Sequence, residues 1–162
     1  MIRKKTHPAK RVPTLFLKAV IWLIGLFILG VCIFVLPTGF MSDETEYYRP
    51  IIIGLYIPAI PFFFALYQAV KLLNYIDKNK VFSNLAVICL QKIKYSAAII
   101  CGLFIAGMPY IYYAADRDDA PGVLAIALVI AFASLVIASA AGLFQRLLQN
   151  AVDIKSENDL TV

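Results

Sequence analysis

The sequence has 162 residues, of which 62% are hydrophobic, and a formal net charge of +5. Its mean hydropathy is +0.82, whereas hydrophobic residues supply only about half of an ordinary soluble domain. The excess is concentrated in four long blocks, and the connections between them are too short for a separate soluble domain. The composition therefore excludes an ordinary soluble protein and predicts one integral membrane domain.

Each of the four blocks is long enough to cross a bilayer as a helix. A hydrocarbon core of about 30 Å needs roughly 20 residues at about 1.5 Å per residue. The predicted fold class is therefore all-α integral membrane, with four transmembrane helices, short extracellular loops and a cytoplasmic helical hairpin between helices two and three. The helices are expected at about 15–36, 51–73, 95–115 and 123–148, within a domain of residues 15–148 that a basic segment (1–14) and a polar tail (149–162) flank.

The basic residues are distributed unevenly between the two sides of these helices. The N-terminal region through Lys18 carries six Lys and Arg, the central stretch carries five, and the C-terminal region carries two. The two remaining connections contribute Arg49 and Arg117 only. Connections rich in Lys and Arg stay on the cytoplasmic side of a membrane. We therefore expect both termini and the central stretch to be cytoplasmic and the two short acidic loops to be outside.

The central stretch, Lys71–Lys94, carries most of the polar character of the chain. Helix two is expected to continue to about Ile76 and to break at the polar run Asp77-Lys78-Asn79-Lys80. Ser83 or Asn84 suits the N-cap of the next helix, because a short polar side chain accepts a hydrogen bond from a free backbone amide. The stretch therefore predicts a short helical hairpin on the cytoplasmic side.

Two interpretations of this basic hairpin are open. It can orient the chain and attract anionic lipid headgroups, with each Lys contributing about 1 kcal/mol near the surface. It can instead dock a cytoplasmic protein, whose acidic face the lysines would attract while Phe82 supplies an apolar anchor. Direct nucleic-acid binding is not expected, because the cluster lacks a groove-reading element. The candidate docking residues are Asp77, Lys78, Lys80, Phe82, Ser83, Lys92 and Lys94, joined by Glu157, Asn158 and Asp159 of the tail.

Two prolines, Pro58 and Pro61, fall inside the second expected helix. Each removes a backbone donor and clashes with the preceding turn, which predicts a kink near residues 58–62. Freed carbonyls need partners in a membrane, so the kink is either a structural bend or the wall of a cavity. A cavity for a small solute or a lipid is the alternative function. Its candidate residues are Tyr56, Pro58, Pro61, Tyr67 and Gln68.

A stripe of small residues, Ser134, Ala138 and Gly142, runs along the fourth expected helix. Their spacing of four places them on one face, where they let another backbone approach closely. Packing within the chain is the simpler interpretation. Self-association into a homo-oligomer, or a place as a structural subunit of a larger membrane complex, is the alternative.

The sequence lacks the side chains that transport or catalysis usually requires inside a membrane. No Asp, Glu, Lys or Arg lies within the hydrocarbon depth of the expected helices, where a coupled ion would bind such a residue. No zinc ligand set, phosphate-binding glycine loop or nucleophile–base pair is recognisable. Asp116, Asp118 and Asp119 in the turn after helix three are more typical of a solvated turn than of a metal site. We therefore expect neither an enzyme nor a cofactor.

Several segments resemble one family of bacterial membrane proteins. The family is a domain of unknown function, number 2975, and the resemblance extends over nearly the whole chain. It implies a four-helix protein of the bacterial inner membrane. The segments are Ile76-Asp77-Lys78-Asn79-Lys80-x-Phe82-Ser83, Leu90-x-Lys92-Ile93-x-Tyr95 and Glu157-Asn158-Asp159-Leu160-Thr161-Val162, together with Ile60-Pro61-Phe62-Phe63 and Asp118-Asp119-Ala120-Pro121-Gly122.

The resemblance also implies a type of partner. Members of this family look like partners of a small cytoplasmic helix-turn-helix DNA-binding protein. The implied function is a membrane-held regulatory or sensory partner of such a protein, and the resemblance assigns no role to any single residue. This function agrees with the basic hairpin, the polar tail and the absence of catalytic groups.

Overall fold

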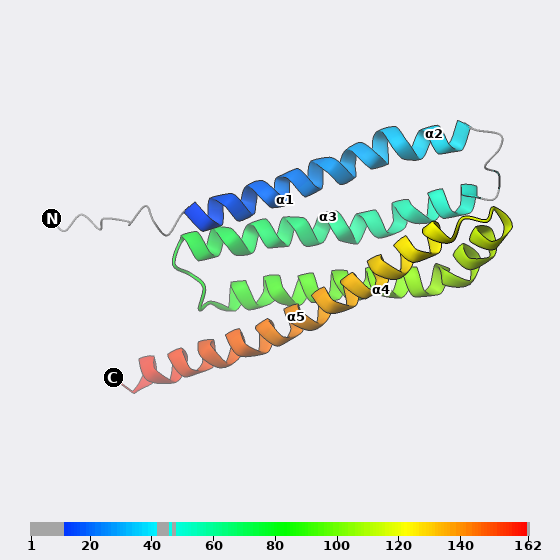
Figure 1. Ribbon diagram of the computed structural model, residues 1–162. Coiled ribbons are helices and arrows are strands. Elements are labelled where there is room, and N and C mark those ends of the chain that lie inside the picture. The colour runs from blue at the N-terminus through cyan, green and yellow to red at the C-terminus, as the bar shows by residue number, and fades with distance from the viewer. Residues whose placement is uncertain (1–11, 42–45, 47, 162) are drawn as a thin grey trace.

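A computed structural model describes residues 12–41, 46 and 48–161 and shows four long helical segments joined by short connections (Figure 1). The described part of the chain contains helices and turns and no strand, which confirms the predicted all-α fold class. The first segment consists of α1 (Val12–Gly30), a π-helical turn η2 (Val31–Val35) and α2 (Leu36–Met41). The other three are α3 (Arg49–Asp77), α4 (Asn84–Arg117) and α5 (Pro121–Leu160).

All four segments are long and apolar enough to cross a membrane, and each contains one of the expected spans. The last segment extends furthest beyond its expected span. Helix α5 has 40 residues, so it is about 60 Å long, twice the thickness of a hydrocarbon core of about 30 Å. The sequence after Gly142 contains no Pro or Gly that would end a helix, so α5 continues past residue 148 and through most of the polar tail. Residues 1–11 of the expected N-terminal segment lie outside the described residues.

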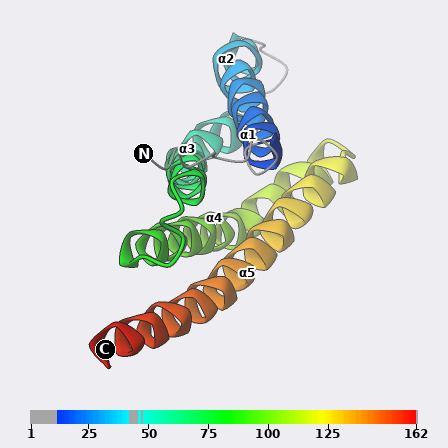
Figure 2. The ribbon, with the colours of Figure 1, turned by 90° about the vertical axis from the view of Figure 1, so that its left-hand side faces the viewer.

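The helices form a single layer rather than a closed bundle. Figure 2 shows α1, α3, α4 and α5 following one another across this layer, with α5 crossing α4 obliquely. The contact between α4 and α5 is the most extensive, α3 packs on the other side of α4, and α1 packs on α3. The buried cluster is centred accordingly on α4 and α5, and its members are Ile100, Phe104, Ile111, Ala127 and Ala131.

Large apolar side chains remain exposed on every helix. In the most apolar window of the first segment only 6% of the residues are buried, against 33% in α4. Lipid tails are as apolar as leucine, so such a surface is stable in a bilayer and would be unstable in water. The single layer is therefore consistent with four transmembrane helices.

The two ends of the layer carry different connections, one basic and the other acidic. The basic end contains the start of α1, the α3–α4 turn (Lys78–Ser83) and the last turns of α5 (Figure 1). The acidic end contains α2, the start of α3 and the α4–α5 turn (Asp118–Ala120).

Both turns end the preceding helix with a residue in the left-handed conformation. Asn79 has a φ of 55°, and the Lys80 amide donates to the Tyr75 carbonyl at 2.8 Å. Asp119 has a φ of 50°, and the amide after it donates to the carbonyl five residues earlier at 2.9 Å. This cap satisfies carbonyls that the end of a helix leaves free, and Asn and Asp adopt it more readily than other residues with a side chain. The predicted break at residues 77–80 is confirmed.

The π-helical turn η2 lets the first segment continue through Pro37, which has no N–H to donate. The Leu36 amide donates to the Val31 carbonyl, five residues earlier. In this register the Cys32 carbonyl would need the amide that proline lacks. The Tyr56 hydroxyl of α3 donates to the Cys32 oxygen at 2.8 Å instead. The helix therefore continues to the end of α2, beyond the end expected near residue 36.

Replacing Tyr56 with Phe tests this account of the π-helical turn. Tyr56→Phe should lower the free energy of unfolding by roughly 0.5–2 kcal/mol, because a carbonyl in hydrocarbon loses its donor. Thermal unfolding of the purified protein in detergent measures the loss. Tyr67→Phe is the matched control, since Tyr67 lies on the same helix and makes no hydrogen bond with its hydroxyl among the described residues. An equal loss in both variants would contradict the proposed role of Tyr56.

Candidate functional site

A groove at the basic end joins the start of α4 to the end of α5. It has a volume of about 320 Å³. Its walls combine exposed apolar side chains with hydroxyl, amide and charged groups of both signs, and two of the apolar ones, Phe82 and Leu160, are 56% and 83% exposed. We call it the α4–α5 groove. Its lining residues are Phe82, Ser83, Asn84, Val152, Lys155, Ser156, Asp159 and Leu160.

Ser83 fixes the α4 side of this groove. Its Oγ accepts a hydrogen bond from the Ala86 amide at 3.4 Å and donates to the Lys80 carbonyl at 2.7 Å. The backbone of Ser83 is extended, as an N-cap residue requires. The predicted N-cap is therefore confirmed. The same two hydrogen bonds connect Ser83, the residue after Phe82, to the turn before it and to the first turn of α4.

The other wall is one face of the long α5 helix. Val152, Lys155, Ser156 and Asp159 follow a spacing of three, four and seven residues, which places them on the same side of a helix. Asp159 is one of the predicted docking candidates, whereas Val152, Lys155 and Ser156 were not predicted. Residues 149–162 were expected to be a polar tail, to which helical spacing does not apply. That spacing was the signal that could have identified this wall.

Asp77 has a different role from the one expected. It is the last residue of α3, and its carboxylate pairs with the Lys18 ammonium of α1. The two side chains are 21% and 19% exposed, so water screens the pair only in part. The contact fastens the first segment to α3 at the basic end. Asp77 therefore connects two helices and does not line the α4–α5 groove.

The remaining docking candidates surround the groove without lining it. Lys78 and Lys80 are exposed in the α3–α4 turn, and Lys92 is exposed further along α4. Glu157 and Asn158 are exposed in the last turns of α5. The structure thus brings Phe82, Ser83 and Asp159 together in one groove, and five of the other candidates are exposed outside it.

Lys94 is the exception, because it is half-buried between α4 and α5. A Cβ atom added to Gly142 would lie 3.1 Å from the Lys94 Cδ. The lysine side chain therefore crosses α5 where Gly142 leaves room for it. Its Nζ lies 5.0 Å from the centroid of the Tyr95 ring, within the range of a cation–π contact.

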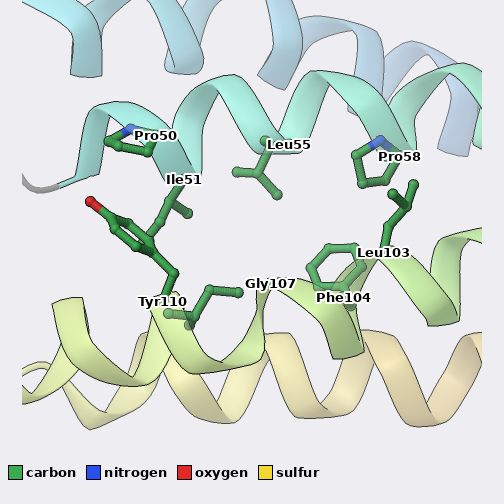
Figure 3. Close-up of a pocket in the computed structure, with 10 residues that line it drawn as sticks. Pro50, Ile51, Leu55, Pro58, Leu103, Phe104, Gly107 and Tyr110 are labelled. Atoms are coloured by element: carbon green, nitrogen blue, oxygen red, sulfur yellow. The ribbon is translucent and has the colours of Figure 1, made fainter.

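The alternative cavity forms between α3 and α4, but four of its five expected residues do not line it. It has a volume of about 200 Å³ and includes Pro58. Figure 3 shows the α3 and α4 side chains facing each other across it. Tyr110 carries the one hydroxyl group among its ten lining residues, so the cavity offers little to bind a polar solute. The lining residues are Pro50, Ile51, Gly54, Leu55, Pro58, Leu103, Phe104, Gly107, Tyr110 and Ile111.

The other cavity candidates are distributed over different surfaces of α3. This helix remains uninterrupted through Pro58 and Pro61, so the expected kink does not break it. The Tyr56 hydroxyl is bound to Cys32, and Tyr67 lines a separate apolar groove of about 570 Å³ between α1 and α3. Gln68 is only 3% exposed. The structure does not bring the five residues of the alternative hypothesis around one cavity, because Tyr56 and Tyr67 face the first segment whereas Pro58 faces α4.

The small residues of α5 pack against α4. Ser134 is 8% exposed, and its Oγ donates to the Ile130 carbonyl at 2.7 Å. Ala138 and Gly142 are half-buried, and Lys94 of α4 crosses Gly142. Three further alanines on this helix, Ala127, Ala131 and Ala141, are buried. The stripe therefore contributes to packing within the chain, the simpler of its two interpretations.

The acidic turn at the other end does not gather a metal-ligand set. Within the described residues no three His, Cys, Asp or Glu side chains are close enough to hold a metal ion. Asp118 instead lies near Tyr48, just before α3. Desolvation and this neighbouring carboxylate raise the pKa of the Tyr48 phenol above its ordinary value. The carboxylate is thus placed beside a phenol at the start of α3.

Comparison with known proteins decides the family. Residues 7–162 match the family described as "Protein of unknown function (DUF2975)". The chain belongs to the DUF2975 family. It is also 52% identical over 158 residues to the uncharacterized membrane protein YoaS of Bacillus subtilis (strain 168). The aligned region covers 94% of this chain and 99% of that protein. No solved structure matches the chain. The DUF2975 assignment confirms the resemblance seen in the sequence and agrees with a multi-pass membrane protein.

The Lys18–Asp77 pair can be measured by a double-mutant cycle in this DUF2975 protein. Lys18→Met and Asp77→Asn should show a coupling of roughly 1 kcal/mol in the free energy of unfolding, because each single variant leaves a partly buried charge without this partner. The control cycle combines Asp77→Asn with Lys78→Met, which removes an exposed neighbouring lysine. Equal coupling in the two cycles would mean that Lys18 is no more than a member of the general basic surface.

Proposed function

We propose that this DUF2975 protein is a regulatory or sensory partner of a small cytoplasmic helix-turn-helix DNA-binding protein and is held in the bacterial inner membrane. The observation that carries the proposal is the α4–α5 groove, in which Phe82 of the α3–α4 turn faces the last turns of α5. The groove combines an exposed apolar anchor with polar walls. This combination is typical of a surface that binds another protein.

The length of α5 supports a location of the groove outside the bilayer. Leu160 follows the last basic residue of the expected span, Arg146, by 14 residues, which is about 21 Å of helix. A side chain of the size of Phe or Leu gains about 1.5–3 kcal/mol when it is fully removed from water. Phe82 and Leu160 are largely exposed. A partner that covered both would therefore gain binding free energy that the isolated protein does not use.

The charges around the groove support a partner with an acidic face. Lys78 and Lys80 are exposed directly before Phe82, whereas Lys155 shares the opposite wall with Asp159, so the acidic face would lie against the α3–α4 turn. Such an arrangement raises the rate of encounter with an acidic surface and orients it, while the apolar anchor contributes more to affinity. We therefore assign recognition to the lysines and most of the binding energy to Phe82.

The proposal also requires the basic end to be cytoplasmic. The connections at this end carry the great majority of the Lys and Arg residues in the sequence, which is the pattern of cytoplasmic connections in multi-pass proteins. With an even number of spans, both chain ends lie on the same side. The groove then faces the compartment in which a DNA-binding protein functions.

Co-purification tests the partner. The tagged full-length protein, solubilised in a mild detergent, should retain a small helix-turn-helix DNA-binding protein that mass spectrometry identifies. Phe82→Ala should weaken binding about thirtyfold or more, since a central aromatic anchor commonly contributes about 2 kcal/mol or more. The triple variant of Lys78, Lys80 and Phe82 to Ala should abolish retention. The control is Leu85→Ala, because Leu85 is 51% exposed nearby on α4 but does not line the groove. Unchanged retention in the triple variant would remove this surface from consideration.

Cysteine labelling tests the orientation separately. In a variant without the three native cysteines, Lys78→Cys should not react with a membrane-impermeant thiol reagent in intact cells and should react after lysis. Asp116→Cys is the matched control at the acidic end, and it should react in intact cells. The reverse pattern would place the α4–α5 groove outside the cytoplasm and would exclude the proposed partner.

A further inference from the structure

A second cavity lies between α4 and α5, nearer the middle of α5, and differs in chemistry from the groove described above. It has a volume of about 310 Å³. Two cationic side chains and one hydroxyl line it, together with small and apolar residues. The lining residues are Lys94, Ala138, Ser139, Gly142, Leu143 and Arg146. The two cations come from different helices, so the fold and not the local sequence brings them together.

The cations have no acidic partner among the described residues. Helix α4 carries no Asp or Glu before Asp116, which is at its far end. On α5 the first carboxylate after Arg146 is Asp153, two turns further on. It accepts a hydrogen bond from the side-chain amide of Gln149 at 2.9 Å. Two neighbouring positive charges repel each other unless an anion lies between them. The cavity therefore has the electrostatic character of an anion site.

The position of the cavity indicates where the anion comes from. Lys94 is the residue directly before the expected span 95–115, and Arg146 lies in the last turn of the expected span 123–148. Both cations thus lie at the level at which the two helices leave the hydrocarbon core. This is the level of lipid headgroups, and basic pockets between helices at this level bind anionic lipids.

The apolar residues continue the cavity toward the middle of the membrane. Ser139, Gly142, Leu143 and Arg146 share one face of α5, and Leu135 lies on the same face one turn deeper. Leu135 is 53% exposed and Leu143 is 60% exposed. An acyl chain could lie over these side chains while its phosphate stays with the cations. A free phosphate ion would use only the upper half of such a site.

We propose that this cavity binds the phosphate group of an anionic membrane phospholipid. Lys94 and Arg146 supply the charge-assisted hydrogen bonds, and Arg146 can engage two phosphate oxygens at once. The Ser139 hydroxyl now donates to the Leu135 carbonyl at 2.9 Å, and it can rotate to donate to a phosphate oxygen instead. Gly142 is part of the site because it leaves room for the Lys94 side chain. The inference is independent of the protein partner proposed above.

Native mass spectrometry of the full-length protein in detergent micelles tests this site, with phosphatidylglycerol and phosphatidylcholine as the probes. The protein should retain one phosphatidylglycerol in preference to phosphatidylcholine, whose choline group neutralises its phosphate. Lys94→Gln and Arg146→Gln should each weaken retention about fivefold, and the double variant about twenty-five-fold, if each cation contributes as a basic residue near a membrane surface does.

Two further variants distinguish a specific lipid site from general electrostatic attraction between the basic residues and anionic lipid. Lys78→Gln combined with Lys80→Gln removes two positive charges, as the double variant above does, but takes them from the α3–α4 turn and leaves the cavity intact. It should change retention less than either single variant above. Gly142→Leu keeps both cations and fills the cavity, and it should abolish the preference. Equal losses in the two double variants would overturn the proposal. So would unchanged retention in Gly142→Leu, displacement of the lipid by excess inorganic phosphate, or no preference between the two lipids.

Discussion

Hydrocarbon offers no hydrogen-bond partner to a backbone amide or carbonyl, and the structure of this chain follows from that constraint. Every segment inside the apolar region must therefore satisfy its own backbone, which a helix does. The π-helical turn shows what happens where the sequence interferes. Pro37 cannot donate, the register changes, and a tyrosine hydroxyl from the neighbouring helix reaches the Cys32 carbonyl. At the ends of α3 and α4, Asn79 and Asp119 turn the chain while the carbonyls of the last helical turn stay occupied.

Within this constraint, α4 organises the packing. It takes part in the two most extensive helix–helix contacts, with α5 and with α3, and it contains the largest share of buried residues. On the α5 side of its contact with α5 the buried residues are small, so the larger apolar side chains of α4 can pack close to the α5 backbone. The same close contact places α4 and α5 side by side at the basic end. Both the α4–α5 groove and the cationic cavity are consequences of that pairing.

The sequence was sufficient for those features that depend on residues close together in the chain. Apolar length predicts the four helices, the polar run predicts the break after α3, and Ser83 predicts the start of α4. The Lys18–Asp77 pair was not predictable, because its residues are 59 positions apart and nothing local relates them. The contact between the Lys94 side chain and Gly142 was not predictable either, because these residues lie on different helices. Polarity also misled the assignment of the tail, since a helix outside the membrane needs a helical spacing rather than an apolar composition.

The candidate site was predicted only in part, because some of its residues are brought together by the fold and not by their nearness in the sequence. Phe82, Ser83 and Asp159 were chosen from their chemical character, and the fold places them in one groove. Their companions Val152, Lys155 and Ser156 could be identified only when α5 was known to continue. Four of the five cavity candidates of α3 do not line the cavity, because residues near each other in a helix point in several directions, so proximity in sequence does not place them around one space.

Helix α5 is continuous from Pro121 to Leu160, with no break between its apolar part and its polar part. Such a rod has no joint at the membrane surface, so its two halves must move as one body. If the bilayer became thinner or thicker, the helix would adjust by changing its tilt. That rotation would swing the Asp159 wall away from Phe82 or toward it. The width of the α4–α5 groove would therefore depend on the tilt of α5.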